Sequence, residues 1–325
     1  MKDKKTLIIG LGGSGIKIIN SIKRNYSQSD YTYLAIDLDR GHLNNNRLLS
    51  PSEIGDIGFS NHDFKKRTLK ASANLIGLSG TAMTHLFSGI NYGATQIRGI
   101  GRLAFLANYD SIKNLIQLKI EEINNHQDNQ LGNFKNIQVV ICFSICGSTG
   151  SGIFLDVANI VKEYLNERGQ VTANILMPSL YQDFQACQMI FGNAYASMRE
   201  LDFFMSWRGW HKESEYKLQM AENVFYKIYN HTSNGPFNNV NYYNNKDNDG
   251  RMYQVNDIID IISTNIINNT ERDILVTGDV GLYERCRTDY QNINKCPGLF
   301  DIDKRITQKI DDAKFELSSD YFKTF

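Results

Sequence analysis

The most informative stretch of this sequence reads Ser144-Ile-Cys-Gly-Ser-Thr-Gly-Ser-Gly152. It follows residues 137–144, a continuous apolar and β-branched run that is typical of a strand buried on both faces of a parallel sheet. Residues 154–165 then have the spacing of an amphipathic helix. Glycines at such a junction let backbone N–H groups approach a phosphate, the helix N-terminus attracts negative charge, and the hydroxyl side chains add donors. The stretch therefore predicts a phosphate-binding loop.

A second glycine-rich stretch, Gly10-Leu-Gly-Gly-Ser-Gly15, lies between a strand-like segment at 5–9 and a helix-like segment at 16–22. Taken alone, it also fits the GxGxxG fingerprint of dinucleotide-binding proteins, in which Asp37, after a strand-like segment at 31–36, would bind the ribose. A dinucleotide-dependent oxidoreductase has one such loop, whereas this chain has two, and the GxxxxGK[ST] pattern of P-loop NTPases does not occur. The two loops therefore predict that one phosphate chain is bound from two strand ends.

Strand-like and helix-like segments alternate along the N-terminal half, up to a strand-like segment at 171–177. This alternation predicts the α/β class, with a doubly wound, mostly parallel sheet. Helical spacing at 184–210 is followed by a strand-like segment at 223–229, a long Asn-rich loop at 230–249, a long helix at 255–267 and a last helix near 306–317. We expect a nucleotide-binding α/β domain at 1–250, a central core helix at 251–270 and a short C-terminal segment at 271–325.

The composition is typical of a soluble globular protein, since 42% of the 325 residues are hydrophobic and 22% are charged. Lysine plus arginine and aspartate plus glutamate both number 35, so the net charge is zero. This balance argues against a general binder of nucleic acid or of membrane surfaces, because both depend on excess positive charge. No apolar run is long enough for a transmembrane helix. Five dispersed cysteines and six scattered histidines predict reduced thiols, a cytoplasmic location and no metal-ligating side chains.

Both glycine-rich loops resemble those of the tubulin/FtsZ superfamily. Residues 146–152 are similar to its GGGTGSG signature, with Cys146 and Ser148 in place of two glycines. Residues 9–15 are similar to the IGVGGGG loop of FtsZ and occupy the expected N-terminal position. The resemblance covers roughly residues 5–268 and implies a GTP-binding α/β domain followed by a long central helix.

The other nucleotide loops of the superfamily have counterparts in the same order. Residues 35–39 resemble the second loop, whose acidic side chain lies near the ribose and phosphates, and residues 93–102 match the spacing of the third loop, which faces the γ-phosphate in FtsZ. Arg98 and Arg102 would there stabilise charge on the terminal phosphate, with a solvated loop arginine as an equal alternative.

The guanine end of the site is implied by the start of the helix at 255–267. Asn256 resembles the asparagine of tubulin's central helix that pairs with guanine, and a side-chain amide offers a donor and an acceptor together. Met252 or Tyr253 would cover the face of the base, and Asn230 or Asn234 would be a second base contact.

The implied ligand is GTP or GDP with Mg²⁺, although one asparagine does not exclude ATP. Asp183 or Gln185 would contact the ribose. The implied nucleotide contacts are Gly12, Gly13, Ser14, Gly15, Asp37, Asp39, Ala94, Thr95, Arg98, Gly147, Ser148, Thr149, Gly150, Ser151, Gly152, Asp183, Asn230 and Asn256.

Catalysis and assembly are implied less directly. In this superfamily, an acidic loop after the central helix of the next subunit completes the hydrolytic site, so that hydrolysis follows head-to-tail assembly. The Asn-x-Asp-x-x-Asp pattern of FtsZ does not occur, and Asp273 and Asp279 are the candidates to orient the attacking water in trans, a solvated acid being the alternative. Fewer than fifty residues follow Asp279, which indicates a reduced or truncated second domain.

Two functions therefore stay open. The first is a tubulin-like GTPase that assembles with copies of itself into filaments. The second is a GTP-binding regulatory or scaffold subunit of a larger complex that does not polymerise. The sequence does not decide whether the chain hydrolyses GTP, or which cellular process it serves.

Overall fold

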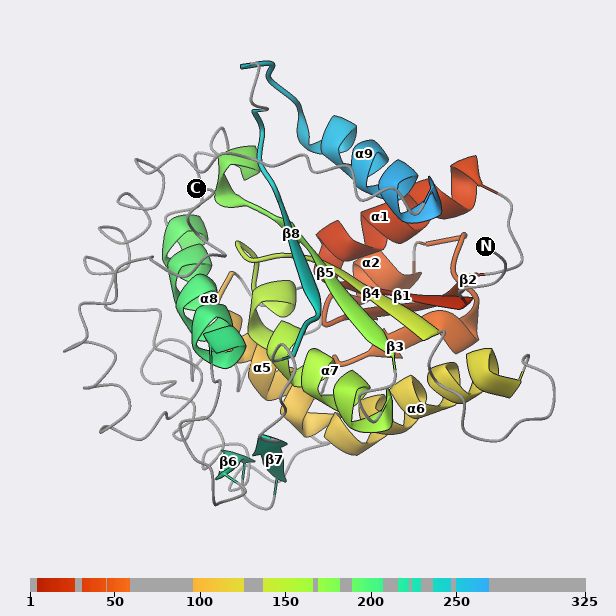
Figure 1. Ribbon diagram of the computed structural model, residues 1–325, viewed down its shortest axis with the longest axis vertical. Helices are drawn as coiled ribbons and strands as arrows, with labels where there is room; N and C mark the ends of the chain where they lie inside the picture. The colour runs from red at the N-terminus through yellow and green to blue at the C-terminus, as the bar shows by residue number, and fades with distance from the viewer. Residues whose placement is uncertain are drawn as a thin grey trace.

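The computed structural model describes residues 5–26, 31–44, 46–58, 96–125, 137–165, 169–181, 189–206, 216–221, 224–228, 236–246 and 250–268. Their main feature is a six-stranded sheet with the strand order β3-β2-β1-β4-β5-β8, in which every neighbouring pair is parallel (Figure 1). The strands are β1 (Lys5–Leu11), β2 (Tyr31–Asp37), β3 (Ile54–Asp56), β4 (Ile137–Ser144), β5 (Gln170–Leu176) and β8 (Asn239–Tyr243). The predicted α/β class and parallel sheet are confirmed.

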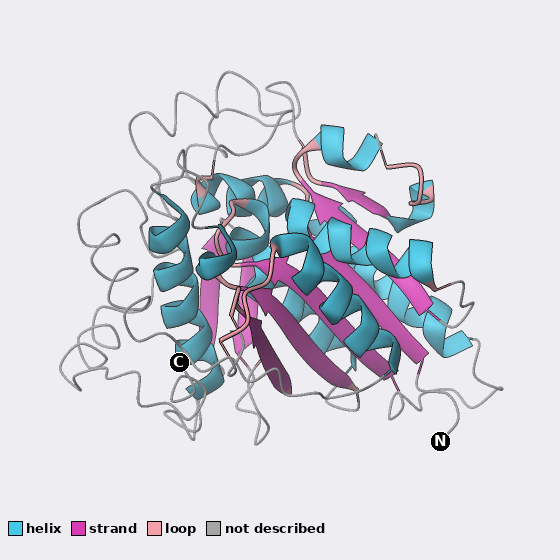
Figure 2. Cartoon of the chain, turned by 90° about the horizontal axis from the view of Figure 1, so that it is seen from above, coloured by secondary structure: helices cyan, strands magenta, loops and turns pink. Residues whose placement is uncertain are grey.

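Helices cover both faces of this sheet (Figure 2). One face packs against α1 (Gly12–Asn25), the short α2 (Arg40–Asn44) and α9 (Val255–Asn268). The other face packs against α5 (Arg98–Ala107), α6 (Tyr109–Asn125), α7 (Thr149–Leu165) and α8 (Met189–Ser206). The chain winds in one direction from β1 to β2 and in the other from β4 to β5, which is the doubly wound arrangement.

Alternation along the strands explains why both faces are covered. Leu7 and Ile9 of β1 are buried on the face of α5–α8, whereas Ile8 between them is buried on the face of α1 and α9. In β4, Ile141 and Val140 alternate in the same way. Successive side chains of a strand point to opposite faces, so an unbroken apolar run requires a cover on both.

Helix α9 lies along α1, as Figure 1 shows in blue and red. Its buried residues Ile258, Ile259 and Ile262 share one face, because Ile262 follows the other two by four and three positions. Polar contacts flank them, since the Ser21 hydroxyl donates to Asp260 at 2.7 Å. The helix predicted at 255–267 is therefore confirmed with nearly the same bounds.

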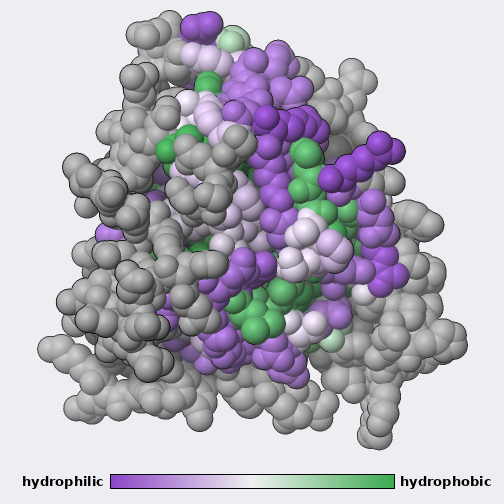
Figure 3. Space-filling model, turned by 90° about the vertical axis from the view of Figure 1, so that its right-hand side faces the viewer, coloured by the Kyte–Doolittle hydropathy of each residue, from purple (hydrophilic) through white to green (hydrophobic). Residues whose placement is uncertain are grey.

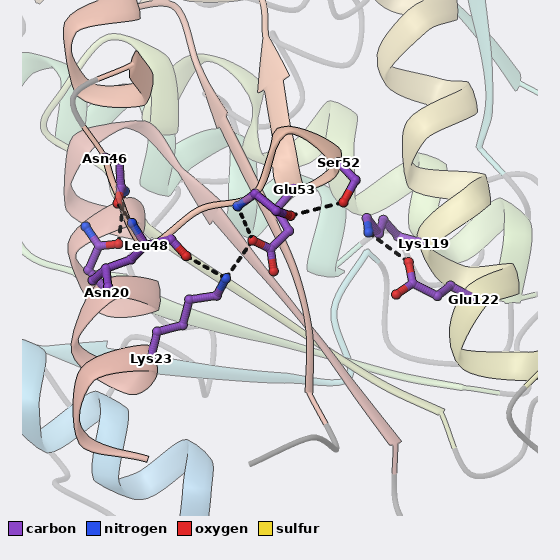
Figure 4. Close-up of polar contacts among 9 residues, drawn as sticks. Asn20, Lys23, Asn46, Leu48, Ser52, Glu53, Lys119 and Glu122 are labelled. Atoms are coloured by element: carbon purple, nitrogen blue, oxygen red, sulfur yellow. Dashed lines mark hydrogen bonds and ion pairs between the residues drawn. The ribbon is translucent and has the colours of Figure 1, made fainter. Parts of the chain in front are cut away.

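The segment before β3 is anchored to α1 by Lys23, whose Nζ lies 2.6 Å from a carboxylate oxygen of Glu53 and donates to the carbonyl of Leu48 at 2.9 Å (Figure 4). Glu53 also accepts from the backbone of Ser50 and completes a capping box on the short 3-10 helix η1 (Pro51–Glu53). These contacts fix the edge of the sheet beyond β2.

On the face drawn in Figure 3, hydrophilic residues predominate among the coloured atoms, and hydrophobic residues form separate small areas. Among the described residues, Leu118 and Met252 are the large hydrophobic side chains that are exposed, each at 60%. None of the described helices is long and apolar enough to cross a membrane.

The strand predicted at 223–229 is confirmed as β7 (Val224–Ile228), which pairs antiparallel with β6 (Tyr216–Ala221) in a separate two-stranded sheet. The loop predicted at 230–249 was wrong, because it contains β8, the sixth strand of the main sheet. Because β8 is an edge strand with exposed asparagines, it lacks the buried apolar run that marks the central strands. The helix predicted near 306–317 lies outside the described residues.

Candidate phosphate-binding site

The two glycine-rich loops lie at the point where the winding direction of the sheet reverses. Strands β1 and β4 are neighbours in register, with Leu11 opposite Phe143. The helix after β1 covers one face of the sheet and the helix after β4 covers the other. Their first turns therefore diverge above adjacent strand ends, and open α/β sheets bind ligands in the crevice at such a switch point.

Gly12 and Gly150 bring the two loops into direct contact. A Cβ atom on Gly12 would lie 3.3 Å from the backbone nitrogen of Gly150 and 3.4 Å from Cβ of Thr149. Gly12 has a φ of +69°, which side chains rarely adopt, so its backbone conformation favours glycine and the close contact leaves little room for a side chain. The predicted proximity of the loops is thus present in the structure.

Three helices begin at this site, and none has an acidic residue of its own at its N-terminus. Helices α1, α5 and α7 have no acidic residue in their first turns, although acids are favoured at that position. Within the described residues, α1 and α5 also have no side-chain cap on their first backbone N–H groups. The first four N–H groups of a helix lack partners inside the helix, so this arrangement favours an anion.

Open space distinguishes one glycine of this site from the others. No described atom lies within 4 Å of the position that a Cβ would take at Gly147. At Gly101 of α5, by contrast, a Cβ would lie 2.5 Å from the carbonyl oxygen of Ser148, and at Gly15 it would collide with the carbonyl of Cys142. Gly15 therefore allows α1 to pack closely on β4, and Gly101 allows α5 to pack closely on the loop at Ser148. The space beside Gly147, by contrast, is open.

Two of the three predicted hydroxyl donors are engaged within the protein. The hydroxyl of Thr149 donates to Asp37 Oδ1 at 2.9 Å, and the hydroxyl of Ser151 donates to the carbonyl of Gly147. Asp37 is 2% exposed and also accepts from the backbone of Leu38 at 2.7 Å. In this arrangement Asp37 joins the end of β2 to the glycine-rich loop after β4, in addition to the predicted contact with ribose or phosphate, which stays a prediction.

His42, which the sequence analysis assigned no role, lies at the mouth of the site. Its Nδ1 is 2.9 Å from Asp37 Oδ2 and its ring is next to the Cα of Gly13. The pKa of His42 is raised above 6.5, chiefly by the hydrogen bond with Asp37. Burial and the charge of Lys17 on α1 act to lower this pKa, whereas the charges of Asp37 and Asp39 act to raise it. A proton on His42 therefore places positive charge beside the first glycine loop.

Tyr181 is a second residue that the sequence analysis missed. It ends the 3-10 helix η3 (Pro178–Tyr181) after β5, and its hydroxyl lies 2.9 Å from that of Ser14. Burial raises the pKa of Tyr181 to about 12, with hydrogen bonds from Ser14 and Ser144 opposing that rise. Tyr181 thus remains a neutral hydroxyl that links the first loop to the end of β4.

The predicted role of the two arginines is not the one that the structure gives them. Both lie in the first turns of α5, not in an open loop, and are 2% and 1% exposed. Arg98 pairs with Glu200 of α8, and Arg102 pairs with Asp156 of α7, which is fully buried. Their charges are neutralised inside the protein, because an unpaired charge at such depth would be costly.

Comparison with known proteins identifies the family. The profile of a family described as tubulin-like matches residues 7–315. The chain belongs to this family. The resemblance to the tubulin/FtsZ superfamily is therefore confirmed. A comparison with curated proteins found no match.

Solved structures of other tubulin-like proteins resemble this one only moderately. CetZ from Methanosaeta thermophila is 13% identical, with 88% of this chain and 58% of CetZ covered and a TM-score of 0.46. TubZ of Clostridium botulinum phage c-st is 13% identical, with 82% and 59% covered and a TM-score of 0.47. A GTPγS-form protofilament of TubZ from Bacillus thuringiensis serovar israelensis is 14% identical, with 82% and 56% covered and a TM-score of 0.45. The chain spans a little over half of these proteins, and the family assignment depends on the matched profile alone.

Two asparagines bear on the predicted base contacts, the predicted Asn256 and Asn244, which was not predicted. Asn256 is exposed in the first turn of α9. Asn244 directly follows β8, is 6% exposed, and its Oδ1 accepts from the Ser179 hydroxyl at 2.9 Å. Because β8 lies within the stretch predicted as a loop, Asn244 and not Asn230 follows the last strand of the main sheet. Met252, the predicted cover for the face of the base, is 60% exposed.

Several predicted site residues lie outside the described residues. They are Ala94, Thr95, Asp183, Gln185, Asn230, Asn234, Asp273 and Asp279.

Proposed function

We propose that this chain binds GTP and GDP, with the phosphates in the crevice between the N-termini of α1 and α7. The observation that carries the proposal is the contact between the two glycine loops, in which Gly12 lies against the backbone of Gly150 at neighbouring strand ends. Two sets of backbone amides and two helix dipoles then act on the same anion. Membership of the tubulin-like family supports guanine as the base.

The described residues fit such a ligand. The amides of residues 12–15 and 147–150 would bind the phosphate oxygens, and the space at Gly147 would admit them. Protonated His42 would add positive charge at the edge of the site. Among the described residues, no group of three or more His, Cys, Asp or Glu side chains comes together. Mg²⁺ would be bound by the phosphates and water with at most one or two carboxylates, as is usual for this ion.

The base would lie toward the segment after β8 and the start of α9. Asn256 is exposed there and offers the donor and acceptor of an amide. Asn244 is the second candidate contact, in place of Asn230 as the residue after the last strand of the main sheet. A guanine-specific site should bind GDP at least about tenfold more tightly than ADP, a difference of about 1.4 kcal/mol.

Calorimetric titration with GDP, GTP, ADP and NAD tests the proposal. We expect GDP and GTP to bind with one site per chain, and ADP and NAD to bind far more weakly. Tight NAD binding without GDP binding would assign the chain to the dinucleotide-binding proteins instead. Asn256→Ala should weaken the binding of GDP, because it removes a proposed contact with the base. The affinity for inorganic triphosphate should be unchanged, because this ligand has no base.

The proposal extends to self-assembly and GTP hydrolysis by family resemblance. Asp273 or Asp279 of a neighbouring copy would then orient the attacking water. Light scattering and phosphate release, each measured with GTP and with GDP, test this part. If GTP binds but scattering and phosphate release stay at background, the chain is instead a GTP-binding subunit that does not polymerise.

A further inference from the structure

Helix α8 contacts the backbone of two separate segments behind the phosphate-binding site. Asn193 of this helix is fully buried, and its Nδ2 donates to the carbonyl of Gln96 at 2.7 Å and to that of Cys146 at 3.0 Å. The carbonyl of Gly147 lies 3.4 Å from the same nitrogen. One side-chain amide therefore joins the segment before α5 to the glycine loop after β4.

A second contact with the same two segments lies two turns further along α8. Glu200 follows Asn193 by seven positions and so faces the same side of the helix. Its two oxygens accept from Arg98 Nη1 at 3.0 Å and Nη2 at 2.5 Å. Arg98 Nη2 also donates to the carbonyl of Ser151 at 2.9 Å, so Glu200 reaches the first turn of α7 through Arg98.

The backbone at Gln96 shows that the first contact holds an unfavourable conformation. Gln96 has a φ of 62°, the one positive value at a residue other than glycine in the described chain. Such conformations cost energy and persist where surrounding contacts hold them. The hydrogen bond from Asn193 to the Gln96 carbonyl is such a contact.

The direction of these hydrogen bonds determines where the loop amides point. In a trans peptide, the C=O and the following N–H point in opposite directions. Because the Cys146 carbonyl points to Asn193 on α8, the N–H of Gly147 points away from α8. The Gly147 carbonyl is bound by the hydroxyl of Ser151 and lies near Asn193, so the N–H of Ser148 is turned away as well.

We propose that Asn193 is a positioning residue for phosphate binding, because it holds two loop carbonyls against α8 and thereby directs the amides of Gly147 and Ser148 to the phosphates. Glu200 supports this arrangement through Arg98. The inference rests on the proposed nucleotide site. It adds that α8, which does not itself form the crevice, sets the affinity for the phosphate chain.

Asn193→Asp is the most direct test, because it keeps the shape of the side chain and replaces the donor with an oxygen facing carbonyl oxygens. We expect the dissociation constants of GDP and GTP to rise about tenfold or more, and that of guanosine to change less than about twofold. A residue that merely stabilised the fold would affect all three ligands alike. Asn193→Ser, which adds no charge, should show the same pattern with a smaller change.

Ser197→Ala is the matched control. Ser197 lies one turn after Asn193, is fully buried, and its hydroxyl has no hydrogen-bond partner among the described residues. This variant should bind GDP as the wild type does. Wild-type GDP affinity in a folded Asn193→Asp chain would overturn the inference, and so would equal losses of GDP and guanosine. Absence of nucleotide binding by the wild-type chain would instead refute the proposed function.

A measurement on the wild-type chain covers the case in which both Asn193 variants fail to fold. Addition of GDP should slow hydrogen exchange at the amides of Gly147 and Ser148. If GDP binds and exchange at these two amides is unchanged, the amides do not contact the phosphates and the inference is wrong.

Discussion

Gly147 offers a sharp test of the phosphate site, because its Cβ position is open in the free protein and would be filled by the ligand in the complex. No described atom lies within 4 Å of that position, and Gly147 does not have a positive φ. Gly147→Ala should therefore fold normally. We expect a change in melting temperature of less than about 4 °C, since alanine restricts the unfolded chain without straining the native one.

Nucleotide binding should change far more than stability. Forcing one additional methyl group into a filled site costs about 1–3 kcal/mol. This cost corresponds to an increase of about 5- to 150-fold in the dissociation constant for GDP. Calorimetric titration of the purified variant with GDP measures the increase, and thermal unfolding without nucleotide measures stability.

Gly101→Ala is the matched comparison on the other side of the same loop. A Cβ at Gly101 would lie 2.5 Å from the Ser148 carbonyl oxygen and 3.1 Å from the Cα of Thr149, so α5 must move. This variant should lose about 1–3 kcal/mol of stability or more. A folded Gly147→Ala chain with wild-type GDP affinity would refute the reasoning, because the space at Gly147 would then not be used by a phosphate.

Three further predictions concern buried or partly buried charges. Asp156→Asn should lower the free energy of unfolding by about 3–5 kcal/mol in denaturant titrations, because Arg102 would keep a buried charge without a counter-ion; a loss below 1 kcal/mol would contradict this. Asp37 raises the pKa of His42 in the folded protein above the value of about 6.5 in the unfolded chain. The contact between His42 and Asp37 therefore contributes fully to stability below pH 6.5, and this contribution is lost as the pH rises through the folded-state pKa. The stability difference between wild type and His42→Gln should accordingly shrink between pH 6 and pH 8.5, and a constant difference would argue against the His42–Asp37 contact. Burial lowers the pKa of Lys162 to about 8. The charged form of Lys162 therefore lowers the stability of the folded protein below pH 8, and this loss of stability disappears as the pH rises toward 10.5. Lys162→Met should therefore gain more stability at pH 7 than at pH 10, as measured by unfolding at both pH values.

The central part of the fold could be predicted because its signals are local. Residues 139–143 are apolar throughout, so they must be covered on both faces, and a glycine-rich turn follows closely. The same holds for β1 and the loop after it. Neighbouring parallel strands then bring the ends of both segments to one edge of the sheet, which is why Gly12 and Gly150 could be expected to meet.

Strand β8 could not be predicted in the same way. At the edge of the sheet, Asn239 and Asn241 remain exposed and Val240 is only half buried, so the apolar run that identifies a central strand is missing. Its pairing with β5 depends on tertiary context, which local composition does not contain. Asn230 was therefore predicted at the position after the last strand of the main sheet, which Asn244 occupies in the structure.

The arginines of α5 illustrate a different limit. An arginine beside glycines has the same local sequence whether it faces a phosphate or a carboxylate. For Arg98, the partner is Glu200, which is 102 positions away in the chain. Asp37 precedes His42 by only five positions, and an acid so close in the sequence is a possible partner for a histidine. The local sequence does not, however, predict that the two side chains meet.

A crystal structure of the chain with GDP bound tests the central claim most directly. The account predicts phosphate oxygens within about 3.2 Å of backbone nitrogens from both glycine loops, among them those of Gly13 and Gly150. Phosphates bound by one loop alone, or at another edge of the sheet, would contradict it.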